Sequence, residues 1–200
     1  MRTKMLAQIC LVLLIASVAV TAQAEPIISV TPDFVGPIGC TDTATFTVNY
    51  DPNGYEVGGG PVELDGFEIV LENGAGEIID FTNTDVTNLG WPGMFFNVQV
   101  GDQVKVSGAT FNSERLVEAT DLFTIVVHGT SASGLGELNI ATVSLAREGN
   151  VNIPVEPWAN PMATIEIDCT PPDAPVMLAE PPYTAGNENT VYWNTVADAV

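Results

Sequence analysis

The stretch Thr43-Ala44-Thr45-Phe46-Thr47-Val48-Asn49-Tyr50 decides the fold class. Its apolar residues alternate with threonine and asparagine, so Phe46, Val48 and Tyr50 lie on one face of an extended strand. A strand with one apolar face is typical of an antiparallel sheet that packs that face into a core.

Similar short runs continue along the chain. They are rich in β-branched and aromatic residues, and they fall at residues 27–31, 67–71, 77–81, 98–106, 122–127, 138–145 and 163–167. Gly, Pro, Asn and Asp separate them, and Val100-Gly101-Asp102-Gln103 predicts a tight hairpin. Only residues 112–120 predict a short helix. The pattern predicts an all-β chain, with an antiparallel β-sandwich over residues 25–169 that is long enough for one hydrophobic core.

The N-terminus carries the features of an export signal. Arg2 and Lys4 precede an apolar stretch over residues 5–20, and Ala22-Gln23-Ala24 has the small-x-small pattern that signal peptidase cuts. The alternative is a transmembrane anchor, but the apolar stretch is shorter than the roughly 20 residues that a span needs. We therefore expect residues 1–24 to be a cleaved signal peptide. The protein would then be secreted or held at the cell surface, with no membrane insertion after cleavage.

The rest of the chain is strongly acidic. Its Lys and Arg residues are Lys105, Arg115 and Arg147, against 25 acidic residues, which gives a net charge near −22. Such a surface repels a phosphate backbone, so nucleic acid is not an expected partner, and neither is an anionic membrane.

Two cysteines, Cys40 and Cys169, remain after the expected cleavage. An even pair in an exported chain predicts a disulfide, which here would join the two ends of the sandwich. A zinc site is the alternative, but it needs more ligands than two thiols and the single histidine supply.

A domain boundary follows Cys169. Residues 170–175 (Thr-Pro-Pro-Asp-Ala-Pro) predict a stiff, extended linker. Residues 176–200 contain the strand-like piece Thr190-Val191-Tyr192-Trp193 but are too few for an independent core. We expect them to be the start of a second β module of which the sequence holds only part, and a disordered tail is the alternative.

Residues 28–167 resemble the bacterial cohesin-type modules, which share a jelly-roll sandwich with several families of carbohydrate-binding modules. The segments that carry the resemblance are residues 28–32 and 46–50, the Gly-Phe-x-Ile-x-Leu strand at 66–71, the aromatic segment at 91–100 and the closing Leu/Ile-Ala-x-Val-x-Leu strand at 140–145. The resemblance implies a jelly-roll fold and a non-catalytic module that binds or scaffolds a partner protein. This sequence departs from the cellulosomal cohesins in having the predicted Cys40–Cys169 bond. The resemblance therefore does not imply that the module binds a dockerin.

The residues after Pro175 resemble the start of a fibronectin type III or immunoglobulin-like repeat. Glu180-Pro181-Pro182-Tyr183 leads into the strand-like piece, with Trp193 at the position where such domains bury a tryptophan. This resemblance implies a multi-domain secreted or cell-surface protein.

The sequence gives little support to catalysis. The single histidine, His128, lies at the end of an apolar run, and the sequence contains no Gly-x-Ser-x-Gly elbow. An ordinary strand-end histidine is therefore the simpler interpretation. Carboxylates cluster at two places and could in principle serve a glycosidase, but 25 acidic residues cluster by chance alone. These residues are Glu63, Asp65, Glu68 and Glu72, and then Glu114, Glu118 and Asp121. We expect no enzyme.

Candidate binding residues remain. Trp91, Trp158 and Tyr55 sit beside Gly or Pro in expected loops, where rings either form an exposed platform for a polysaccharide or cap the core. Asp51, Asn53 and Glu56 place oxygen ligands around a turn, which indicates either a structural calcium site or an ordinary turn, and no other cofactor is expected.

Three functions therefore stay open. They are a protein-binding or scaffolding module, a carbohydrate-binding module of a polysaccharide-degrading system, and a structural spacer of an adhesin. A broad, mildly apolar sheet face favours the first, coplanar exposed rings the second, and a uniformly acidic surface the third.

Overall fold

The computed structural model describes residues 24–74, 76–110, 115–148, 151–155, 162–171 and 176. The described residues form strands and no helix. The short helix expected at 112–120 is wrong for its described part, residues 115–120, where Leu116 forms an isolated bridge with Leu64. No helix in these ranges is long and apolar enough to cross a membrane. The predicted signal peptide up to residue 23 and the predicted second module after Val176 lie outside the described residues.

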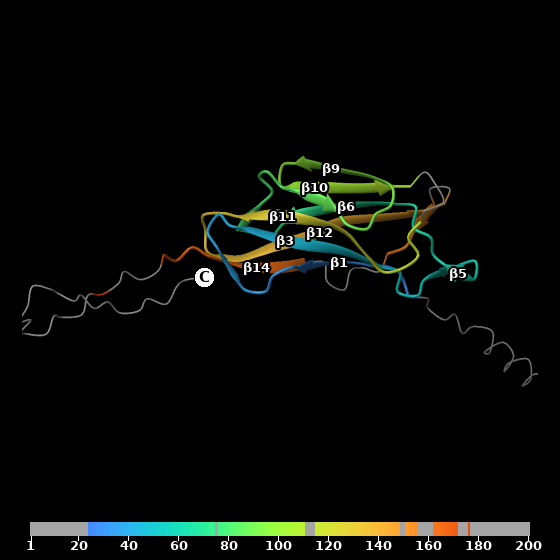
Figure 1. Ribbon diagram of the computed structural model, residues 1–200, viewed down its shortest axis with the longest axis horizontal. Coiled ribbons are helices and arrows are strands. Elements are labelled where there is room, and N and C mark those ends of the chain that lie inside the picture. The colour runs from blue at the N-terminus through green and yellow to red at the C-terminus, as the bar shows by residue number, and fades with distance from the viewer. Residues whose placement is uncertain are drawn as a thin grey trace, which may run out of the picture.

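The strands are arranged in two layers (Figure 1). One layer is a five-stranded antiparallel sheet in the order β1-β3-β11-β7, with β8 also paired to β11. Its strands are β1 (Ile27–Pro32), β3 (Thr43–Asp51), β7 (Ile79–Asp80), β8 (Val86–Asn88) and β11 (Thr120–Gly129). Residues 43–50, from which the fold class was predicted, therefore lie at the centre of this layer.

The other layer is a seven-stranded sheet in the order β2-β14-β12-β6-β10-β9, with β13 paired to β12. Its strands are β2 (Pro37–Gly39), β6 (Gly66–Asn73), β9 (Met94–Val100), β10 (Gln103–Ala109), β12 (Gly134–Arg147), β13 (Val151–Ile153) and β14 (Met162–Asp168). All its pairs are antiparallel except β2 with β14. The short strands β4 (Glu56–Val57) and β5 (Gly60–Pro61) form a separate ribbon. The predicted all-β sandwich is confirmed.

The alternating pattern of the sequence builds the core. In β3 the residues Ala44, Phe46, Val48 and Tyr50 are buried, while the threonines between them face outward. The same alternation buries Phe67, Ile69 and Leu71 in β6. All fully buried side chains in the described residues are hydrophobic, so the two sheets are held together mainly by apolar burial.

Aromatic rings join the two layers at one end of the core. The Phe67 ring of β6 stacks on Phe123 of β11, with ring centroids 6.1 Å apart. Trp91 packs against Phe67 in a T-shaped arrangement with ring centroids 4.9 Å apart, and Phe95 of β9 packs against Phe67 and Phe123. Gly108 makes room for them, since a Cβ built there would lie 2.4 Å from Phe67 and 2.7 Å from Trp91.

The predicted disulfide between Cys40 and Cys169 is present, with Cα atoms 4.8 Å apart. It continues the parallel pairing of β2 with β14, because Cys40 follows Gly39 and Cys169 follows its partner Asp168. The backbone N–H of Cys169 also donates a hydrogen bond to Ser133. The end of β14 is thereby tied to the turn after β2 and to the loop between β11 and β12.

Removal of this disulfide should lower stability without changing the fold. The bond closes a loop with a sequence separation of 129 residues. Such loops contribute on the order of 4 kcal/mol through the entropy of the unfolded chain. We expect Cys40→Ala/Cys169→Ala to lower the free energy of unfolding by about 2–5 kcal/mol in urea titrations. An unchanged midpoint would show that the bond adds no stability.

Tyr50 holds a buried polar atom at the end of β3. Its side chain is 1 % exposed, and its hydroxyl has no hydrogen-bond partner among the described residues. Burial, with a smaller contribution from the charge of Asp51, raises the pKa of Tyr50 from its ordinary value of 10.0 to about 12. The fold thus favours the neutral phenol. The stability that the folded state gains from holding this phenol neutral is complete below pH 10, and it is lost as the pH rises through 12.

Tyr50→Phe should reduce this alkaline loss of stability. The variant has no phenol to ionise at this site, and it no longer buries an unpaired hydroxyl, which costs about 1–3 kcal/mol. We expect stability at pH 7 to be equal or higher, and the decline between pH 10 and 12 to be smaller by on the order of 2 kcal/mol. Urea titrations across this range measure both effects. The half-exposed Tyr55, as Tyr55→Phe, is the control and should keep the decline.

Candidate functional site

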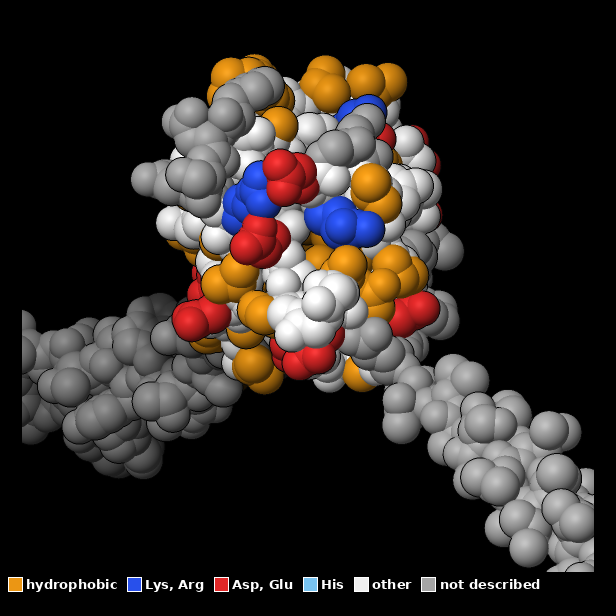
Figure 2. Space-filling model, turned by 90° about the vertical axis from the view of Figure 1, so that its right-hand side faces the viewer, with side chains coloured by type: hydrophobic (Ala, Val, Ile, Leu, Met, Phe, Trp, Pro, Cys, Tyr) orange, Lys and Arg blue, Asp and Glu red, His pale blue; other side chains and the backbone are white. Residues whose placement is uncertain are grey.

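The outward side chains of β9 form a row of exposed apolar groups. Phe95 packs into the core, so the residues that alternate with it face away from the core. Met94, Phe96, Val98 and Val100 are 45 %, 55 %, 51 % and 69 % exposed. We call these four residues the apolar stripe. In Figure 2 hydrophobic side chains gather along the upper edge of the molecule, where Figure 1 places β9.

Polar pairs lie beside the stripe on the same outer face. In the register of the sheet, Lys105 is opposite Val98 and Gln103 is opposite Val100. Lys105 forms a salt bridge with Glu68 at 2.6 Å, and Gln103 donates a hydrogen bond to Glu72 at 3.1 Å. The Lys105–Glu68 pair is nearly half exposed, so it stabilises the fold by at most about 1 kcal/mol. These pairs make the centre of the face polar.

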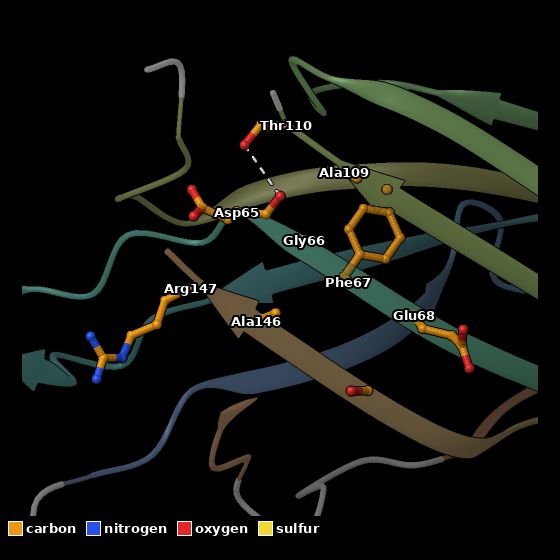
Figure 3. A pocket seen from close by; sticks show the side chains of 10 residues that line it. Asp65, Gly66, Phe67, Glu68, Ala109, Thr110, Ala146 and Arg147 are labelled. Atoms are coloured by element: carbon orange, nitrogen blue, oxygen red, sulfur yellow. Dashed lines mark hydrogen bonds between the residues drawn. The ribbon is translucent and has the colours of Figure 1, made fainter. Parts of the chain in front are cut away.

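A shallow hollow follows on this face toward the end of the sheet (Figure 3). It has a volume of about 440 Å³ and exists because small residues occupy neighbouring strands. They are Gly66 of β6, Ala109 of β10, and Ser144 and Ala146 of β12. The backbone of Asp65 closes one end, where its carbonyl accepts hydrogen bonds from Thr110. A protruding side chain of a partner could enter this hollow beside the stripe.

Arg115 contacts Asp65, one of the residues that line the hollow. Its Nη1 lies 2.5 Å from Glu63 and 3.2 Å from Glu148, and its Nε lies 2.7 Å from Asp65. The hydrogen bonds to Glu63 and Glu148 raise the pKa of Arg115 above its ordinary value. Figure 2 views this end of the molecule and shows acidic and basic side chains in contact. Three carboxylates compensate one guanidinium, so this arginine joins the loop before β6 to the end of β12 and offers no net charge to an anion.

The structure places the predicted aromatic residues differently from an exposed platform. Trp91 is 3 % exposed, and its indole N–H donates a hydrogen bond to the carbonyl of Met94. It therefore caps the core, the second of the two alternatives, and has no free ring face for a sugar. Tyr55 is half-buried against the core. Trp158 lies outside the described residues.

The three residues predicted for calcium lie at the turn between β3 and β4. Asp51 accepts a hydrogen bond from the backbone N–H of Asn53, and Asn53 donates to the carbonyl of Glu25. Glu56 begins the short strand β4. These bonds account for the turn by themselves. Within the described ranges no group of three or more His, Cys, Asp or Glu residues could hold a metal ion, and calcium at this turn stays a prediction.

Five of the carboxylates that cluster in the sequence serve structural contacts, whereas Glu118 takes part through its backbone carbonyl, which accepts a hydrogen bond from Thr120. Glu63 and Asp65 contact Arg115, whereas Glu68 and Glu72 pair with β10. In the second cluster, Asp121 accepts a hydrogen bond from Asn49 of the neighbouring strand. Glu114 lies outside the described residues.

The apolar stripe was not found from the sequence. Residues 94–100 read Met-Phe-Phe-Asn-Val-Gln-Val, with two adjacent phenylalanines that face opposite sides of the sheet. Alternation alone assigns one apolar side to the core but does not say which. The run has no charged residue, but other strand segments such as residues 43–50 and 138–145 have none either, so this feature did not distinguish it.

Comparison with known proteins identifies the fold. No family model and no curated protein matches the chain. Solved structures that are similar include a cohesin module from a family 33 glycoside hydrolase of Clostridium perfringens (TM-score 0.53, 13 % identity, 72 % of this chain and 98 % of that one). A non-cellulosomal cohesin from the archaeon Archaeoglobus fulgidus is similar at TM-score 0.50 and 14 % identity, over 71 % and 91 % of the two chains. A type I cohesin–dockerin complex from Clostridium thermocellum matches at TM-score 0.50 and 12 % identity, over 71 % and 99 %. The fold is a cohesin-like β-sandwich, as the resemblance in the sequence implied.

Trp91→Ala tests the assignment of this ring to the core. Removing a buried tryptophan should lower the free energy of unfolding by about 3–5 kcal/mol. The ring in the folded wild type should also fluoresce as a buried indole. A variant of unchanged stability would contradict the packing and return Trp91 to the surface. Phe34→Ala, at an exposed ring in the loop after β1, is the control and should change stability little.

Proposed function

We propose that this chain is a non-catalytic interaction module that binds a partner protein across the outer face of the seven-stranded sheet. The apolar stripe is the observation that carries this proposal. Four neighbouring hydrophobic side chains, each close to half exposed or more, lie on one strand. Contiguous exposed apolar patches of this kind mark sites of interaction on soluble proteins.

The composition of the face supports a protein partner. Protein interfaces combine an apolar centre with a polar rim, and the stripe is bordered by Lys105, Glu68 and Gln103. The adjacent hollow gives the face relief into which a partner's side chain could fit. The cohesin-like fold adds support, because one of the similar structures is a complex of such a module with a dockerin.

The described residues favour a protein over a polysaccharide. Polysaccharide modules use flat, exposed aromatic rings, preferably tryptophan or tyrosine. Among the described residues the strongly exposed rings are Phe34 and Phe96, which lie in the loop after β1 and on β9. Trp91 is in the core. A purely structural spacer would not need the stripe, since exposing it to water has no compensation without a partner.

We further propose that the module is exported and is part of a larger protein. The disulfide and the expected signal peptide fit secretion or display at the cell surface. The predicted linker at 170–175 and the resemblance of the residues after Pro175 to a fibronectin type III or immunoglobulin-like repeat fit a multi-domain protein in which this module is one part.

The test compares retained proteins for the wild type and a stripe variant. Residues 25–200 would be immobilised and exposed to the secreted proteins of the source organism, and the affinity of each purified captured protein would then be measured by calorimetry. Phe96→Thr/Val98→Thr keeps strand-forming residues but removes two apolar contacts, which should weaken a genuine partner by about 30-fold or more. Val35→Thr, at a 91 % exposed residue in a loop, is the matched control and should bind as the wild type does.

A parallel panel of soluble and insoluble polysaccharides, with and without calcium, addresses the alternative function. The proposal expects no retention. Retention on a glycan that persists in the stripe variant and is lost in Trp158→Ala would make the chain a carbohydrate-binding module instead. Partner binding that is equal in the stripe variant and the control would also overturn the proposal.

A further inference from the structure

β9 is an edge strand of unusual character. Among the described strands it pairs only with β10, so its other side is free along seven residues. The backbone N–H and C=O groups on the free side of an edge strand form a template for another strand. The edge lies at the top of the molecule in Figure 1, away from the five-stranded layer.

The hairpin fixes which backbone groups are free. β9 and β10 are joined by the two-residue turn Gly101-Asp102, and Gly101 has a φ of 60°. In such a turn the carbonyl before it accepts a hydrogen bond from the N–H after it, so Val100 and Gln103 form a hydrogen-bonded pair. Hydrogen-bonded and non-hydrogen-bonded pairs alternate along an antiparallel ladder. The N–H and C=O groups of Asn97 and Gln99 therefore point away from β10, as do those of Phe95.

The other edge strands of the two sheets are short or carry proline, and β9 is neither. At the opposite edge of the same sheet, β2 has three residues and begins with Pro37. In the five-stranded sheet, β1 follows Pro26 and ends at Pro32, whereas β7 and β8 have only two and three residues. Proline, short length and charged side chains are the usual means of preventing strand addition. β9 has none of the three.

The two faces of this edge define the pattern of an added strand. The outer face presents the apolar stripe, and the other face presents Asn97 and Gln99, which are both exposed. Side chains of an added strand would lie beside these residues in alternation. Its apolar residues would extend the stripe, and its polar residues would lie beside the two amides.

The charge of the protein indicates which kind of strand would add to β9. The chain carries 25 acidic residues against five basic ones, so a second copy would be repelled at low ionic strength. A segment with positive charge would be attracted by the same field. The stripe itself has no charge and would repel neither a second copy nor a basic segment. Charge complementarity therefore favours a basic partner over self-association.

We propose that β9 is a strand-addition site for an extended segment of a partner protein, a segment that alternates apolar and polar residues and carries net positive charge. This inference rests on the proposed function, because it specifies how a partner engages the same sheet. The added strand pairs with the free backbone of Asn97 and Gln99, and its apolar side chains cover Phe96 and Val98.

The experiment uses residues 25–200 and a synthetic peptide in which valine and threonine alternate, with lysines at both ends. Amide exchange followed by nuclear magnetic resonance reports on the backbone directly. In the free protein the N–H groups of Asn97 and Gln99 should exchange rapidly, and those of Phe96 and Val98 slowly. Saturating peptide should slow the exchange at Asn97 and Gln99 by about tenfold or more. The same peptide with glutamates in place of lysines should bind at least about tenfold more weakly at low salt.

Asn97→Pro separates strand addition from contact by side chains. Proline removes the outward N–H and is tolerated where that N–H faces solvent, so the hairpin should persist by circular dichroism and thermal unfolding. Peptide affinity should fall by about tenfold or more, while Asn97→Ala, which keeps the N–H, should bind as the wild type does. Gln99→Pro and Gln99→Ala repeat the comparison at the next outward position if the first proline variant does not fold.

The outcomes distinguish this inference from the proposed function. If captured partners are weakened by Phe96→Thr/Val98→Thr but bind Asn97→Pro normally, the face binds protein without strand addition and the inference fails alone. Absence of protection at Asn97 and Gln99 with peptide bound would also overturn it. Dimerisation of the wild type in sedimentation experiments, abolished by Asn97→Pro, would replace the basic partner with a second copy of the chain.

Discussion

The stacking of Phe67 on Phe123 sets the register on which the rest of the molecule depends. It joins the two sheets, and the Trp91 and Phe95 rings complete the cluster, where Trp91 fits against Phe67 only because Gly108 lacks a side chain. Side chains alternate strictly in a strand, so an inward Phe67 directs Gly66 and Glu68 outward. An inward Phe95 likewise directs Met94 and Phe96 outward. The hollow and the stripe are thus consequences of how the core packs, and a slip of one residue in β9 would bury the stripe and expose Phe95.

A sequence without alignment predicts those parts of this fold that rest on local chemistry. The alternation at residues 43–50, the Gly101-Asp102 turn and the Cys40–Cys169 bond were all predicted and are present. Each has a cause within a few residues or within the oxidising compartment that the export signal implies. The bond also needed the parallel pairing of β2 with β14, which no local pattern indicates, to bring its cysteines together.

The candidate site was harder to predict because it depends on sheet order. Nothing in Met94–Val100 says which side of this strand faces the core or that the strand lies at an edge. The first leaves its outward apolar side chains exposed, and the second leaves the backbone on one side unpaired. The sequence left the role of Trp91 open for a related reason. A tryptophan beside proline in a loop fits both a platform and a cap. The cap forms because Gly108, on a later strand, has no side chain and leaves space for the ring. Long-range pairing, which sequence patterns do not encode, determines both outcomes.

Charge and backbone pairing would act on different stages of recognition by such a surface. The acidic field extends about 8–10 Å at physiological ionic strength, so it biases encounter toward basic partners before contact. The stripe itself has no charge, so little desolvation of ions opposes docking once the partner arrives. Backbone hydrogen bonds then depend on the partner being extended rather than on its side chains, and the alternating stripe limits which extended segments fit. The acidic surface would therefore select partners by charge at long range. The free, uncharged edge strand would select among them at short range by their alternation of apolar and polar residues.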